Sequence, residues 1–264
     1  MGLLLLLFSL LLHHAITHLF VLAITKRFPT TPTMDILYAA NWLVSLVQAM
    51  MTTLAGVVFC WQSDLVLMNT KLSLLYPYGW LSLGYWLYDL TTLAMLANKT
   101  TPVTDMTGRY RVVRRAAGQV VTLVRWWPGM VCHHVGVITF LWVAVINTSR
   151  QRGDGMIALS FIMELSSVFV AARSALARLG FKNTRLYLCI SICMVAAFLL
   201  VRILLVPLVI YLYSMEQGLS MVQGMLTMPR QCVMGTVMFY GLNCYWFALM
   251  VRGSVKVFRK YKNL

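Results

Sequence analysis

The chain has 264 residues, of which 60% are apolar and only 11% are charged. A soluble domain carries about a quarter charged residues, so this composition excludes an ordinary soluble fold and indicates an all-α integral membrane protein. The net charge of +15 does not indicate a nucleic-acid partner, because most basic residues fall in loops on one side of the predicted membrane.

Apolar blocks of about twenty residues, the length that crosses the hydrocarbon core as a helix, recur along the whole chain. The first block has no basic start and no small-residue cleavage site, so we interpret it as a retained helix rather than a signal peptide. We expect about seven transmembrane helices, over residues 3–25, 36–60, 73–97, 129–148, 155–177, 187–213 and 231–251.

The distribution of basic residues predicts the orientation of these helices. With seven spans, the loops rich in Lys and Arg lie in the cytosol together with the C-terminus, and the N-terminus is lumenal. The last five residues, Lys260-Tyr-Lys262-Asn-Leu264, match a dilysine signal for the endoplasmic reticulum. The basic loop 98–127 is either a juxtamembrane anchor for anionic lipid or a docking patch for an anionic cosubstrate.

Polar groups within the spans are the candidates for a site, because ionisable residues in a bilayer face the bundle interior and pair with each other. In the first span, His14 and His18 have the spacing of half a metal site, but acidic or cysteine partners are not evident. We favour packing or hydrogen bonding for them and predict no metal; the roles of His13, His14 and His18 stay open.

The histidine pair His133-His134 stands at the cytosolic end of the fourth predicted span. Asn41, Gln48 and Asp89 are expected at a similar depth, and Asp89 is a candidate partner for either imidazole. Histidine, with an ordinary pKa of about 6.5, accepts and returns protons near neutrality. Adjacent helix residues point about 100° apart, so one histidine can act on a substrate while the other bonds across helices. The alternative is a network that only joins helices.

The later spans carry a second set of polar residues. Glu164 is expected to pair with Arg173 or Arg202, and Asn243 lies in the last span. We expect the methionines between Met215 and Met238 to fill packing gaps. Cys60 and Cys232 fall near lumenal span ends, where a disulfide is permitted.

The order of these motifs resembles the TLC-domain family of multispanning endoplasmic-reticulum proteins, which includes the ceramide synthases. The resemblance runs from about residue 34 to 258 and is strongest to the third subgroup of TLC-domain-containing proteins. It rests on Gly84-Tyr85-x-x-Tyr88-Asp89, His133-His134, Glu164-Leu-Ser166 with Arg173, Arg202-x-x-x-x-Pro207 and Asn243-x-x-Trp246-Phe247.

This resemblance implies six helices in a barrel around a lipid-accepting cavity, within a TLC domain over 34–258. Residues 1–33 form an extra helix and link, and 259–264 a basic tail. It implies that His133 and His134 act as catalytic base or accept the acyl chain, and that Asp89 is an orienting partner. Further substrate-binding candidates are Asn41, Gln48, Tyr85, Glu164, Arg173, Arg202, Asn243 and Trp246. Ceramide synthases carry two aspartates three residues apart where this chain has Glu164 and Ser167, so one carboxylate is missing.

Three functions are therefore compared. The first is N-acyl transfer from long-chain acyl-CoA, as cosubstrate, to a sphingoid base, without a bound cofactor. The second is a non-catalytic protein that binds membrane lipid and regulates phospholipid or ceramide composition. The third, a seven-helix receptor, shares the topology but is disfavoured, because the last span lacks the Asn-Pro-x-x-Tyr pattern. Oligomeric state is not predicted.

Overall fold

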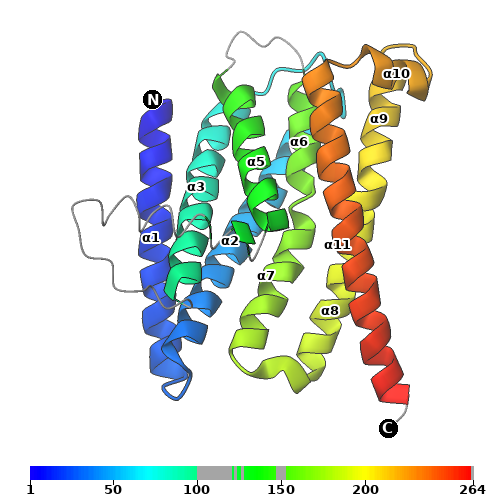
Figure 1. The fold of residues 1–264 in the computed structure, drawn as a ribbon. Coiled ribbons are helices and arrows are strands. Elements are labelled where there is room, and N and C mark those ends of the chain that lie inside the picture. Colours follow the sequence, from blue (N-terminus) through cyan, green and yellow to red (C-terminus); the bar gives the residue numbers. More distant parts are fainter. Residues whose placement is uncertain (100–120, 122–123, 126–127, 147–152, 263–264) are drawn as a thin grey trace. The chain divides into compact units, whose positions relative to one another are not determined.

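The computed structural model describes residues 1–99, 121, 124–125, 128–146 and 153–262. Within these residues the regular structure is helical throughout, which confirms the all-α prediction (Figure 1). The chain divides into two compact units, Met1–Val44 with Pro77–Asn147 and Ser45–Tyr76 with Thr148–Leu264. Most of the basic loop 98–127 and the last two residues of the tail lie outside the described residues.

The first unit contains α1 (Gly2–Arg27), the beginning of α2 (Thr33–Gln62), most of α3 (Leu75–Lys99) and α5 (Pro128–Ile146). These helices coincide with the first four predicted spans. Their shared core is aromatic: Val44, Tyr85 and Tyr88 are buried, and Leu10, Ile16, Phe20 and Trp86 pack against them.

A close approach between α1 and α3 depends on Gly84. A β-carbon at this position would lie 2.6 Å from Cβ of Ser9 and 2.7 Å from the carbonyl oxygen of Leu6. The Ser9 hydroxyl in turn donates to the carbonyl of Leu81 at 2.7 Å. Small residues that let two backbones approach, with a hydroxyl bonding across, are typical of helix contacts in membranes.

In the second unit, the fifth predicted span is two helices, α6 (Asp154–Ile162) and α7 (Leu165–Arg178). At the junction, Met163 N–H donates to the Ser160 carbonyl and Glu164 N–H to the Phe161 carbonyl, at 3.2 and 3.1 Å. These bonds span three residues, so the helix tightens there rather than unfolding. The junction places Glu164 between the two helices.

The sixth predicted span is also irregular. It comprises α8 (Arg185–Phe198), the π-helix η2 (Leu199–Leu204) and α9 (Leu205–Glu216). Pro207 has no N–H for the carbonyl four residues earlier, Ile203, which accounts for the altered hydrogen bonding just before it. The π-helix carries Arg202, which is buried.

The remaining described elements are η1 (Phe181–Asn183), α10 (Met221–Thr227) and α11 (Arg230–Lys262). The short α10, which we did not predict, begins with a capping box formed by Ser220 and Gln223. It lies against α9, since a β-carbon on Gly224 would collide with the Ser214 side chain.

The α2–α3 loop is fixed within the second unit by two carboxylates. Glu216 accepts hydrogen bonds from the N–H groups of Leu67 and Met68, at 2.9 and 3.1 Å. Asp154 accepts from the N–H of Leu72 at 2.9 Å. Charged side chains at the ends of α9 and α6 therefore supply partners that the loop backbone would otherwise lack.

Five stretches of the described residues are long and apolar enough to cross a membrane: Gly2–Arg27, Thr33–Gln62, Asp154–Arg178, Arg185–Glu216 and Cys232–Val255. With α3 and α5 at the other two predicted positions, the structure agrees with a multispanning helical membrane protein. The expectation for the methionines is wrong except at Met228, which is buried; Met215, Met221, Met225, Met234 and Met238 are exposed. Their apolar side chains suit contact with lipid, which is as apolar as a protein core.

Candidate functional site

The polar residues of the first unit that were predicted to lie at one depth of the membrane are all buried. Asn41, Asp89, His133 and His134 are each at most 9% exposed. Polar groups shielded from water require partners, because an unsatisfied donor or acceptor in a low-dielectric interior carries the full cost of desolvation. For Asn41, Asp89 and His134 the structure supplies such partners from neighbouring helices.

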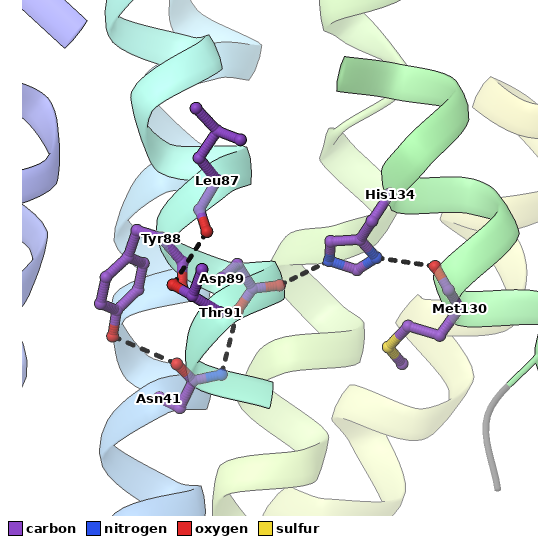
Figure 2. Close-up of polar contacts among 7 residues, drawn as sticks. All are labelled: Asn41, Leu87, Tyr88, Asp89, Thr91, Met130 and His134. Carbon is purple, nitrogen blue, oxygen red and sulfur yellow. Dashed lines mark hydrogen bonds and ion pairs between the residues drawn. The ribbon is translucent and has the colours of Figure 1, made fainter. Parts of the chain in front are cut away.

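The centre of this cluster is a hydrogen-bonded His–Asp pair between α5 and α3. His134 Nε2 lies 2.7 Å from Asp89 Oδ2 (Figure 2). The other ring nitrogen, Nδ1, lies 2.8 Å from the carbonyl oxygen of Met130. A carbonyl oxygen only accepts, so Nδ1 carries a proton. Both nitrogens of His134 are therefore engaged by the protein, and the predicted bond between Asp89 and a histidine is formed.

The other oxygen of the Asp89 carboxylate, Oδ1, is bound by a residue of α2. The amide nitrogen of Asn41 donates to Asp89 Oδ1 at 3.0 Å, and the Tyr88 hydroxyl donates to Asn41 Oδ1 at 3.2 Å (Figure 2). The Tyr88 hydroxyl also contacts the Thr17 hydroxyl on α1. The Thr17, Tyr88, Asn41, Asp89 and His134 side chains thus form one continuous polar network across four helices, hereafter the Asp89 network.

His133 belongs to the same cluster but points differently. Its ring centroid lies 5.9 Å from that of His134, with the two planes at 87°. Trp86 packs edge-on against both imidazoles, with centroid separations of 5.5 Å to His133 and 5.1 Å to His134. The neighbouring histidines therefore share an aromatic wall, while the Asp89 carboxylate pairs with His134.

The three histidines of α1 differ in their contacts and in their exposure. His13 Nδ1 lies 2.6 Å from the Ser9 carbonyl oxygen, and its ring lies 5.6 Å from that of Tyr88. His14 meets the edge of Tyr88 at 5.0 Å, and His18 is exposed. Among the residues that the structure describes, no three His, Cys, Asp or Glu side chains gather as metal ligands.

A second polar cluster lies within the second unit and is centred on Arg202. Its guanidinium donates from Nη2 to Glu164 Oε1 at 2.8 Å and to Ser167 Oγ at 2.9 Å, and from Nε to Ser166 Oγ at 2.9 Å. Of the two expected partners for Glu164, the structure selects Arg202. Arg173 instead donates to Ser191 Oγ at 3.0 Å and lies over the Tyr187 ring.

The other predicted site residues have local surroundings of different kinds. Tyr85 is buried in the core of the first unit, and Gln48 donates to Thr52 on the same helix at 3.2 Å. In α11, Asn243 is buried and Trp246 is half-buried. The candidates therefore fall in both units: Asn41, Tyr85, Asp89, His133 and His134 in the first, and Gln48, Glu164, Arg173, Arg202, Asn243 and Trp246 in the second.

Two members of the Asp89 network, Thr17 and Tyr88, were not predicted as site residues. Tyr88 stands next to Asp89 in the motif that carried the family resemblance, so its position was a usable signal. Thr17 gave none, because a threonine in an apolar helix usually bonds to its own backbone.

The family model of the TLC domain matches residues 39–252. The chain belongs to the TLC-domain family. This match confirms the resemblance seen in the sequence, and it identifies a membrane protein of a family involved in lipid biology. No solved structure matches the chain. The matched range contains Asn41, Asp89, His133 and His134, whereas α1 precedes it.

Proposed function

We propose that this TLC protein is an enzyme of sphingolipid and fatty-acyl metabolism in the endoplasmic reticulum membrane, with a lumenal N-terminus and a cytosolic C-terminus. Its reaction is the transfer of an acyl chain from long-chain acyl-CoA to the amine of a sphingoid base. The observation that carries this proposal is the buried His134–Asp89 pair beside a second histidine, His133, in a TLC-domain chain.

The two histidines have different roles in this proposal. His134 has both ring nitrogens in hydrogen bonds to the protein, so it is a positioning residue. His133 is then the general base. As the sphingoid nitrogen attacks the thioester carbonyl, His133 takes the proton from that nitrogen. The C–N bond forms, the C–S bond breaks, and the departing thiolate of CoA receives the proton from His133. The products are a ceramide and free CoA.

The Asp89 pair supports this chemistry through geometry and charge. It fixes the His134 ring, and that ring and Trp86 form the wall against which the His133 imidazole packs. A catalytic base must be held within a fraction of an ångström of its working position. Asp89 is therefore also a positioning residue, acting through His134.

A second candidate function, lipid binding without turnover, is favoured by a different observation. The ceramide synthases resembled here have two aspartates where this chain has Glu164 and Ser167. Both of these side chains accept hydrogen bonds from Arg202, so the single carboxylate is neutralised by an internal partner. In this reading the protein binds membrane lipid and regulates phospholipid or ceramide composition.

Acyl transfer in liposomes distinguishes the two functions. The full-length protein is reconstituted and given labelled acyl-CoA of several chain lengths with a sphingoid base. We expect His133→Ala to lower the rate by about 10²–10⁴-fold, the usual contribution of a general base. His134→Ala is expected to lower it as well, whereas His18→Ala, at an exposed histidine, leaves it unchanged.

Two outcomes of this assay would contradict the proposed histidine mechanism. Turnover that survives both His133→Ala and His134→Ala contradicts it. If the wild-type protein transfers no acyl chain under any condition but is purified with bound lipid, the non-catalytic function is correct instead.

A further inference from the structure

The first helix contributes to the Asp89 network although it lies outside the matched TLC domain. The match begins at residue 39, whereas α1 covers Gly2–Arg27. Thr17 on this helix touches the Tyr88 hydroxyl, which bonds to Asn41 and thereby reaches Asp89. An anchor helix that only held the chain in the bilayer would not require a polar group at this position.

The hydroxyl groups of Thr17 and Tyr88 connect α1 to Asn41. Thr17 and Tyr88 have one hydroxyl proton each, and their contacts include Thr17 with the His13 carbonyl at 2.7 Å, Thr17 with Tyr88, and Tyr88 with Asn41 Oδ1. One contact must therefore go without a proton. The Thr17 proton goes to the His13 carbonyl, so Thr17 Oγ1 and Asn41 Oδ1 compete for the proton of the Tyr88 hydroxyl.

The contact with Tyr88 reaches Asp89 through the Asn41 side chain. Asn41 Oδ1 lies within hydrogen-bond distance of the Tyr88 hydroxyl, at 3.2 Å, which orients the Asn41 amide. This leaves the amide nitrogen of Asn41 to donate to one Asp89 oxygen, while His134 Nε2 lies against the other. Aligned hydrogen bonds of this kind polarise one another. A change at Tyr88 is therefore transmitted through Asn41 to the Asp89 carboxylate and to His134.

The contact between α1 and α3 holds Thr17 in place. Ser9 bonds to the Leu81 carbonyl, and Gly84 lets the two backbones approach. Tyr88 itself is completely buried, with the rings of His13 and His14 packed against it. The phenol therefore has little freedom to turn away from Thr17.

We propose that α1 is a working part of the site and that Thr17 is a positioning residue. Thr17 acts through Tyr88 and Asn41 on Asp89, and so sets the orientation of the Asp89 carboxylate and of His134. The expected effect on acyl transfer rests on the proposed function, but the effect on the network does not.

The test compares Thr17→Val with Thr17→Ser and Thr25→Val. Valine keeps the shape of threonine and removes the hydroxyl, and serine restores the hydroxyl. Thr25 is the matched control, because it bonds to the Val21 carbonyl on the same helix, at 2.8 Å, and is exposed. The first readout is the ring ¹⁵N resonance of His134 in nanodiscs, assigned by its loss in His134→Gln. The second is kcat and KM for acyl transfer.

We expect Thr17→Val to shift the His134 resonance and to lower kcat by about threefold to tenfold, the effect of one buried hydrogen bond. Thr17→Ser and Thr25→Val should retain the wild-type resonance and kcat. A His134 resonance that is the same in Thr17→Val and wild type overturns the inference, whatever the enzyme does. A shifted resonance in a protein without any acyl transfer supports the inference and refutes the proposed function alone.

Discussion

The Arg202–Glu164 ion pair allows a quantitative prediction about the second unit. Arg202→Met removes three donated hydrogen bonds and leaves the carboxylate of Glu164, whose side chain is 17% exposed, without its counter-ion. Removing one partner of a buried ion pair costs about 3–5 kcal/mol. We expect a value of about 3 kcal/mol, at the low end, because partial exposure gives the carboxylate some access to polar surroundings.

The complementary variant, Glu164→Gln, should cost less. Glutamine keeps an oxygen that accepts from Nη2, and Ser166 and Ser167 still accept from the guanidinium. The loss is the difference between a hydrogen bond to a charged acceptor and one to a neutral acceptor, about 1–1.5 kcal/mol. In the double variant, residue 164 carries no charge, so the loss of arginine leaves no unpaired charge behind. The double variant should therefore be more stable than the sum of the two single effects predicts, by about 1–3 kcal/mol.

The free energy of unfolding is measured by titration with a denaturing detergent in mixed micelles, followed by circular dichroism. Arg173→Met provides the control cycle, because Arg173 bonds to Ser191 rather than to Glu164. Its effect should add to that of Glu164→Gln within about 0.5 kcal/mol. If the Arg202 cycle is additive to the same degree, the ion pair does not stabilise the irregular helices and the reasoning is wrong.

Two further predictions concern backbone contacts. Gly84→Ala should destabilise the first unit by about 1–3 kcal/mol in the same unfolding assay, because the new β-carbon meets Ser9 and Leu6; Gly235→Ala, which meets nothing within 4 Å, should not. Glu216→Gln should speed amide hydrogen exchange at Leu67 and Met68 by about tenfold, since the carboxylate that accepts both N–H groups is neutralised. Unchanged exchange there, measured by mass spectrometry, would show that the loop does not depend on Glu216.

The helices were predictable because the bilayer imposes their length. An apolar run of about twenty residues has few alternatives in hydrocarbon, so all seven predicted spans coincide with helices. The interruption at Glu164 and the π-helix before Pro207 were not predicted. Regular and irregular spans have the same apolar composition, so composition does not reveal an interruption. Pro207 alone indicates a position where a helical hydrogen bond is lost. The seven-residue α10 was too short for a pattern to form.

The site was predictable to the extent that charge demands a partner. Asp89 in hydrocarbon requires a cation or donor, and the structure provides His134 and Asn41. The choice of Arg202 over Arg173 for Glu164 was not accessible from the sequence, because it depends on how the helices around Glu164 pack. Thr17 was missed for a related reason. A neutral hydroxyl is satisfied by its own helix, so nothing in the sequence requires it to reach another.

Helix geometry explains why the two adjacent histidines have different contacts. Successive side chains point about 100° apart, so the residue beside His134 cannot share its approach to Asp89. The near-perpendicular rings, at 87°, and the common contact with Trp86 reflect this divergence. In the proposed reaction, the two adjacent histidines thus divide two roles, with His134 as the fixed group and His133 as the base. The bond from His134 to α3 orients α5 and, with it, the direction in which His133 is presented.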